Sequence, residues 1–268
     1  MKKIIFVWLL CSTAPIFSFY DYPFHSSVGK LREINTQHFR IIFSDSSAEH
    51  AFSVAAFAEE EFSSLQEIYG IVTNRFPIHV VVSTDYNTAN AFGSPVSYPT
   101  IHMFTGVAPD LSGLVSYTEP NRLRTLFRHE LTHIVAFSTL SGKKILRPLE
   151  YNFRPTVLLS AGTFIEGSAV QRESDSGYGR MHDPLHYHML RRNLLDDKFP
   201  NFAQMSGAQT AYDTGHFRYT FGSFLSQFLE GKGLKDSRIL ASIRKVAAFC
   251  KNYKVVYWKK TKRIMDKI

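Results

Sequence analysis

The hydrophobic pattern in the first part of the chain predicts a small sheet with one long helix. Short runs rich in β-branched and aromatic residues predict strands at 37–43, 77–83 and 100–106. Apolar residues recur every three or four positions from 48 to 69, which predicts a helix. Residues 85–95 are dense in Asn, Thr, Gly and Pro and are predicted to form a loop. If the third strand formed an edge of the sheet, an extended peptide could pair with its backbone.

The pattern of the second part is mainly helical. Helical spacing of apolar residues predicts helices at 120–142, 158–170, 185–195, 217–229 and 239–249. Pro120 suits the first turn of the first of these helices, and Gly142 suits its end. The two parts together predict an α+β fold, in which a small mixed sheet lobe carries the 120–142 helix and a mainly helical lobe follows.

The 120–142 helix contains the pattern His-Glu-x-x-His. His129 and His133 are four residues apart, so on a helix they point to nearly the same side and could bind one zinc ion. Glu130 lies beside that side and could take a proton from a water molecule that attacks a carbonyl. The pattern therefore predicts a zinc site with Glu130 as the general base.

A catalytic zinc needs a third protein ligand and an open position. Ala136 and Thr139 occupy the positions of the HExxHxxGxxH pattern, which excludes a third histidine there. Glu166 lies inside an apolar helical run, where an ionised carboxylate is costly unless it is paired or bound to a metal. Glu150, in a Pro-bounded loop, and Glu173, in a polar stretch, are rival candidates that we expect to be solvated. Glu166 is thus the predicted ligand.

An oxyanion donor is also needed near the cleft. Tyr219 and His216 are the candidates, and we favour Tyr219. The small residues Gly167 and Ala169 are expected to let the Glu166 helix pack close to the zinc helix.

Other polar residues are expected to be structural. His102 alternates with apolar residues on the third strand and is predicted to be a structural histidine. His182, His186 and His188 could suggest a second metal site, but residues two apart on a helix do not share a side. Arg180 is expected to brace its loop rather than to bind a substrate carboxylate.

The N-terminus has the pattern of an export signal. Residues 1–18 combine a short positive start with a broken apolar run, and cleavage after Ser18 is predicted. The residues before Cys11 lack the small residue expected for lipidation, so we expect an exported, periplasmic or secreted protein. Cys250 then remains as a single cysteine, which fits zinc ligation by His and Glu.

The charge is concentrated at the C-terminal end. The net charge is +8, and twelve of the 31 basic residues lie from Lys232 onward, opposed only by Asp236 and Asp266. We therefore divide the chain into a signal peptide at 1–18, a domain at 19–233 and a basic helical tail at 234–268. The tail could contact an anionic membrane surface or an envelope protein. The main body carries no basic excess, so nucleic acid is not expected as a partner.

These motifs together resemble a known family. The HELTH motif at 129–133, followed by FIEGSA at 164–169, resembles the gluzincin zinc metallopeptidases, and more narrowly exported bacterial MA-like peptidase domains that often precede a β-propeller. The resemblance spans roughly 33–233 and implies a zincin-like fold, with His129, His133 and Glu166 as zinc ligands and Glu130 as general base. Val170 departs from the Glu-x-x-x-Asp form of some gluzincins, and no propeller follows in this sequence.

The predicted function is zinc-dependent hydrolysis of peptide bonds in a peptide or protein substrate. An alternative is a catalytically silent envelope module, for binding or assembly, that keeps the zinc as a structural ion. A third hypothesis is a shortened copy of a longer family member.

Overall fold

The protein is described by a computed structural model. It describes residues 30–70, 77–84, 89–94, 98–106, 122–138, 162–205 and 217–233. The predicted signal peptide, the predicted basic tail, Glu150, His216 and the predicted 239–249 helix lie outside these residues. Within the described part, no helix is both long and apolar enough to cross a bilayer.

The fold is α+β and is built on a five-stranded mixed sheet. The strands are β1 (Arg32–Asn35), β2 (Phe39–Phe43), β3 (Ile78–Ser83), β4 (Ala89–Ser94) and β5 (Thr100–Thr105). Their order is β1-β2-β3-β5-β4, with β2, β3 and β5 parallel and the two outer strands antiparallel to their neighbours. The three predicted strands are confirmed as β2, β3 and β5.

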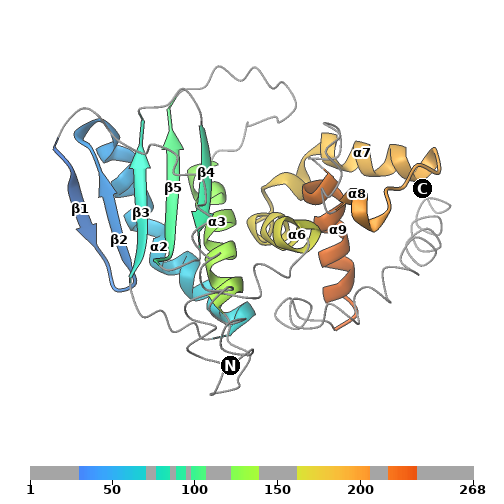
Figure 1. Ribbon diagram of the computed structural model, residues 1–268, viewed down its shortest axis with the longest axis horizontal. Helices are drawn as coiled ribbons and strands as arrows, with labels where there is room; N and C mark the ends of the chain where they lie inside the picture. The colour runs from blue at the N-terminus through green and yellow to red at the C-terminus, as the bar shows by residue number, and fades with distance from the viewer. Residues whose placement is uncertain are drawn as a thin grey trace, which may run out of the picture.

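Helices flank the sheet and form the second half of the described chain (Figure 1). The α-helices are α2 (Ala48–Tyr69), α3 (Arg122–Ser138), α6 (Gly162–Glu173), α7 (Pro184–Leu195), α8 (Phe202–Met205) and α9 (Phe217–Glu230), with short 3-10 turns η2 (Asp45–Ser47) and η4 (Arg180–His182). In Figure 1, α3 lies between the sheet and the group formed by α6 to α9. The predicted arrangement of a mixed sheet followed by a mainly helical part is therefore confirmed in its coarse form.

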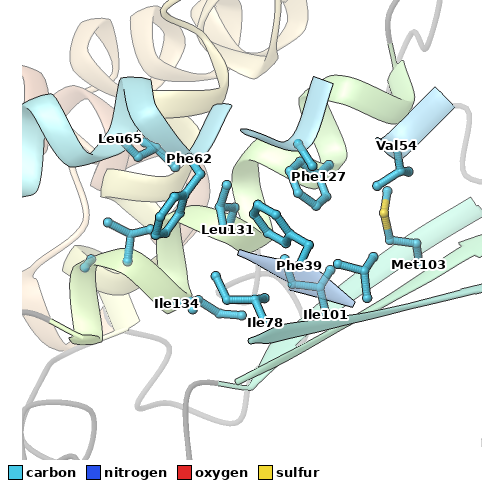
Figure 2. Close-up of a cluster of buried hydrophobic side chains, with 14 of the residues drawn as sticks. Phe39, Val54, Phe62, Leu65, Ile78, Ile101, Met103, Phe127, Leu131 and Ile134 are labelled. Atoms are coloured by element: carbon cyan, nitrogen blue, oxygen red, sulfur yellow. The ribbon is translucent and has the colours of Figure 1, made fainter. Parts of the chain in front are cut away.

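The main core lies between one side of the sheet and helices α2 and α3 (Figure 2). Alternate residues of β2 and β3 are buried, as expected for strands with one side packed on helices. Phe39 from β2 contacts Phe62 of α2 and Phe127 of α3, with ring centroids 5.7 Å apart in both pairs. Every residue of α3 from Phe127 to Ala136 is buried. The helix that carries the His-Glu-x-x-His pattern is thus held from several sides.

The edge of the sheet next to α3 differs from the prediction. The segment 85–95 was predicted to be a loop, but Ala89–Ser94 forms β4 and pairs with β5. β5 is therefore an interior strand, and β4 is the last strand of the described sheet. Asn and Gly have low strand propensity, so the sequence did not indicate this strand. Its pairing with β5 and its close approach to α3 override that local preference.

Gly93 of β4 marks the point of that approach. A Cβ atom added at Gly93 would lie 2.9 Å from the backbone oxygen of Glu130 and 3.0 Å from its Oε2 atom. A larger residue would push the strand away from α3. Glycine here lets the edge strand run directly beside the His-Glu-x-x-His helix.

The helices α6 and α9 pack through two glycines. A Cβ atom at Gly167 would lie 2.3 Å from the backbone carbon of Gly222, and one at Gly222 would lie 2.4 Å from the backbone oxygen of Thr163. The expectation that Gly167 faces the zinc helix is therefore wrong, because Gly167 faces α9. The close contact holds α6 against α9 while another side of α6 faces α3.

Candidate metal centre

Two imidazoles project from α3 toward α6. His129 and His133 are both buried, and their ring centroids lie 4.9 Å apart. Their separation of one helical turn places both on the same side of α3, as the sequence pattern predicts. The opposite side of the same helix carries Phe127, Leu131 and Ile134 into the core, which fixes how the helix is rotated.

Glu166 on α6 comes close to both imidazoles. Its Oε2 atom lies 3.4 Å from Nε2 of His129 and 3.4 Å from Nε2 of His133. These separations exceed those of strong charged hydrogen bonds, which are about 2.7–2.9 Å. Ligand atoms bound to one tetrahedral zinc at about 2.0–2.1 Å lie roughly 3.3–3.4 Å from one another. The separation of Glu166 Oε2 from each imidazole nitrogen therefore matches that between two ligands of a single small cation.

The imidazoles and the carboxylates around them also shift one another's pKa values. Burial and the charge of Arg180 oppose protonation of His129, yet hydrogen bonding to Glu166 and Glu173 raises its pKa to about 9. Burial alone would raise the pKa of Glu166, but the two histidines outweigh it and hold that pKa below its usual range. The site thus holds a carboxylate together with positive charge. Two imidazoles and one carboxylate are a donor set that a divalent cation such as zinc can bind once the imidazoles are neutral.

Glu130 lies at the edge of this centre. Its carboxylate is within 4.8 Å of ligand atoms of both histidines, so it could in principle serve as a ligand itself. Glu130 follows His129 by one residue and so points about 100° away around the helix. Its Oε2 atom is on the side of Gly93 and β4. That position suits a carboxylate that acts on a molecule lying between the centre and the edge strand.

Glu173 is a partner of the centre, contrary to the prediction from its polar stretch. It was expected to be solvated, but it is 3% exposed and its Oε2 atom accepts a hydrogen bond of 2.7 Å from Nδ1 of His129. Arg180 donates to the same carboxylate from its backbone N–H, Nε and Nη2. A carboxylate on the second nitrogen fixes the tautomer that leaves Nε2 free for a metal. Val170 has no polar side chain that could accept this hydrogen bond. Because α6 continues to residue 173, Glu173 accepts it instead.

The charge state of Glu173 follows from these contacts. Burial would raise its pKa, but the positive charge and hydrogen bonds of Arg180, together with the His129 bond, keep the pKa below its usual range. Glu173 is therefore ionised. Arg180 braces this carboxylate, in line with the bracing role expected from the sequence.

A buried polar network holds α3 and α6 in register. Arg128, next to His129, donates to Glu61 of α2, to the backbone oxygen of Arg172 at 2.6 Å and to Asp175 at 3.0 Å. Glu61 is 4% exposed, so the charges are compensated inside the fold. The network joins α2, α3 and the end of α6. It helps set the position from which Glu166 reaches the two histidines.

Tyr219 of α9 borders the same region. Its ring centroid is 6.3 Å from that of His129, and the guanidinium groups of Arg180 and Arg218 lie over its ring at 4.8 Å and 5.1 Å. Burial and the carboxylate of Glu166 raise the pKa of Tyr219. The phenol therefore keeps its proton and can donate it in a hydrogen bond.

The remaining histidine candidates do not join this centre. Ile101 and Met103 face the core, so His102 projects from the opposite side of the sheet, where burial lowers its pKa to about 4. Nε2 of His182 lies 2.9 Å from the backbone oxygen of Ser174. His188 is exposed. Among the described residues, these side chains do not gather into a second metal group.

Comparison with known proteins adds a distant relative. No family model matches the chain. An uncharacterized protein of Treponema pallidum (strain Nichols) is 29% identical over 204 residues, which cover 74% of this chain and 17% of the Treponema protein. The chain therefore matches about one sixth of that relative's length.

Proposed function

We propose that this protein is a zincin-like zinc metallopeptidase of the gluzincin type, with His129, His133 and Glu166 as zinc ligands. The observation that carries the proposal is the convergence of Glu166 Oε2 at 3.4 Å from both Nε2 atoms. When bound, zinc would polarise a peptide carbonyl and make a water molecule more acidic. The Glu173–His129 hydrogen bond supports this ligand set, because it directs the free nitrogen of His129 toward the other two ligands.

Glu130 is the proposed general base. It takes a proton from the attacking water and returns it to the leaving amine. It is buried on α3, and its carboxylate lies next to β4 at Gly93. Tyr219, which keeps its proton, donates a hydrogen bond to the oxyanion that forms on the attacked carbonyl.

The edge strand β4 is the proposed docking site for an extended peptide. β4 is the last strand of the described sheet and runs beside Glu130. An extended peptide paired with an edge strand gains backbone hydrogen bonds that do not depend on its side chains. The strand at 100–106, which could have had this role as an edge strand, is the interior strand β5, so we assign the role to β4.

Metal analysis combined with a cleavage assay tests the proposal. We expect about one zinc per chain and chelator-sensitive cleavage of a casein digest, read by mass spectrometry. Glu130→Gln should keep the zinc and lose nearly all cleavage, whereas His133→Ala should lose the zinc. Zinc at full occupancy with no cleavage of any peptide would instead support the silent envelope module.

A further inference from the structure

The arginines around the candidate centre differ in whether a carboxylate pairs with their positive charge. Arg180 pairs with Glu173, with Nε 2.7 Å from Oε1. Arg128 pairs with Glu61 and is buried. Arg218, which precedes Tyr219 on α9, forms no hydrogen bond or ion pair with any described residue. Its described contact is with the ring of Tyr219.

This lack of a partner is costly for Arg218. The residue is half-buried, and its Nε atom is buried without an acceptor among the described residues. A buried donor that has no acceptor loses its hydration without replacement, and such groups in native structures need an explanation. A ligand that supplies the acceptor would provide one.

The position of Arg218 relates it to the proposed reaction. The centroid of the Tyr219 ring lies 5.1 Å from the guanidinium carbon of Arg218 and 6.3 Å from the centroid of the His129 ring. The guanidinium therefore lies within about 11 Å of that imidazole, which an extended peptide spans in about three residues. A substrate group held by Arg218 would sit near the bond to be cleaved.

The charge balance indicates the kind of group. A divalent cation would balance the carboxylates of Glu130 and Glu166, and Glu173 balances Arg180. Arg218 then contributes one positive charge that nothing described compensates. The planar guanidinium is best matched by a carboxylate, which it can bind through two parallel hydrogen bonds.

We propose that Arg218 is a specificity-determining residue that binds a substrate carboxylate within about three residues of the cleaved peptide bond. The carboxylate is either the C-terminus of the peptide or an acidic side chain. This inference rests on the proposed peptidase function. It adds a preference for substrates that are negatively charged next to the reacting bond.

Binding to the Glu130→Gln variant loaded with zinc tests the inference without turnover. The probes are two pairs of N-acetylated hexapeptides, measured by calorimetry. In the first pair a neutral peptide ends in a free carboxylate or in an amide. In the second pair both peptides are amidated, and one carries a Glu where the other carries a Gln. This pair is repeated with the Glu or Gln at each position of the peptide in turn. We expect the acidic member of one pair to bind about 10- to 100-fold more tightly, because charged hydrogen bonds are strong. The pair that shows the difference identifies the source of the carboxylate.

Adding Arg218→Gln should remove that difference, and Arg218→Lys should retain part of it. Arg191→Gln is the matched control, because Arg191 is an exposed arginine on α7 and the preference should persist. Thermal unfolding of each variant checks that the fold is intact. Equal binding of both members of each pair, or a preference that survives Arg218→Gln in a folded protein, would overturn the assignment.

The two proposals fail in different ways. Cleavage of the neutral amidated peptide by the unmodified zinc-loaded protein tests the peptidase function by itself. If that peptide is cleaved but neither pair is discriminated, the Arg218 assignment fails and the peptidase function stands. If no peptide is cleaved but the acidic members still bind through Arg218, the peptidase function fails and the carboxylate site stands.

Discussion

Replacing Glu173 with Gln should weaken zinc binding about 10- to 100-fold, although Glu173 is not a proposed ligand. All contacts of this carboxylate come from donors: Arg180 N–H and Nε reach Oε1, while His129 Nδ1 and Arg180 Nη2 reach Oε2. An amide of the same shape turns one of these oxygens into an NH₂ group. At least one buried donor would then face another donor. The orientation and basicity of His129 would both suffer.

The size of the effect follows from these contacts. A tenfold change in affinity corresponds to about 1.4 kcal/mol, so the expected loss is about 1.4–2.8 kcal/mol. The Glu173→Gln variant should also be less stable than the unmodified protein when both are free of metal. The reason is that Glu173 is buried and that hydrogen bonds to charged groups contribute about 1.5–3 kcal/mol. Zinc affinity is measured by competition with a chromophoric chelator, and stability by urea unfolding of the metal-free protein.

Glu230→Gln is the matched control for this experiment. Glu230 also pairs with an arginine, Arg172, at 2.6 Å, but its side chain is 44% exposed and it contacts neither histidine. Its replacement should leave zinc affinity unchanged. The reasoning is refuted if Glu173→Gln binds zinc as tightly as the unmodified protein and is no less stable than the Glu230 control.

Three further predictions concern other parts of the molecule. Glu130→Gln should bind zinc normally and lose most turnover, at least 100-fold, because the general base is removed; unchanged turnover in a peptide assay would refute the mechanism. Gly167→Ala should destabilise the fold by about 2 kcal/mol or more, because its Cβ would lie 2.3 Å from the backbone of α9. Gly231→Ala is its control in urea unfolding, since a Cβ there meets only atoms at 3.5 Å or beyond. Glu59 should make stability depend on pH: burial would raise its pKa, but hydrogen bonds from His38 and Thr36 lower it. A lowered folded pKa means stability that is present above the unfolded value of 4.5 and lost as pH falls below it. Glu59→Gln should therefore flatten the acid limb of the unfolding curve, and an unchanged limb would show that Glu59 does not contribute.

The edge strand β4 illustrates a feature that local patterns could not indicate. The sequence Ala-Asn-Ala-Phe-Gly-Ser has little strand propensity and was predicted to be part of a loop. Its strand conformation comes from pairing with β5 along the whole of β4. Gly93, which looks like a loop residue in the sequence, is needed for the close approach to Glu130.

Glu173 illustrates the same limit for the site. A carboxylate in a polar stretch usually lies in water, and nothing in the surrounding sequence distinguishes it. Its burial arises because α6 continues past Val170 and because Arg180, seven residues later, folds back onto it. One sequence signal could have found it: seven residues separate Glu166 from Glu173, which is close to two helical turns. Both carboxylates therefore lie on the same side of α6, toward His129.

The sequence by itself determined the paired imidazoles, because two histidines four residues apart on a helix share a side regardless of the rest of the fold. It also determined the three inner strands and the long helix α2, because these have strong local periodicity. Only the tertiary structure decided that Glu173 also meets an imidazole, which strand lies beside the imidazoles and which arginine lacks a partner among the described residues. Those choices depend on how α6 and α9 pack through Gly167 and Gly222 and on how Arg128 joins three helices, and such long-range contacts leave little trace in local patterns.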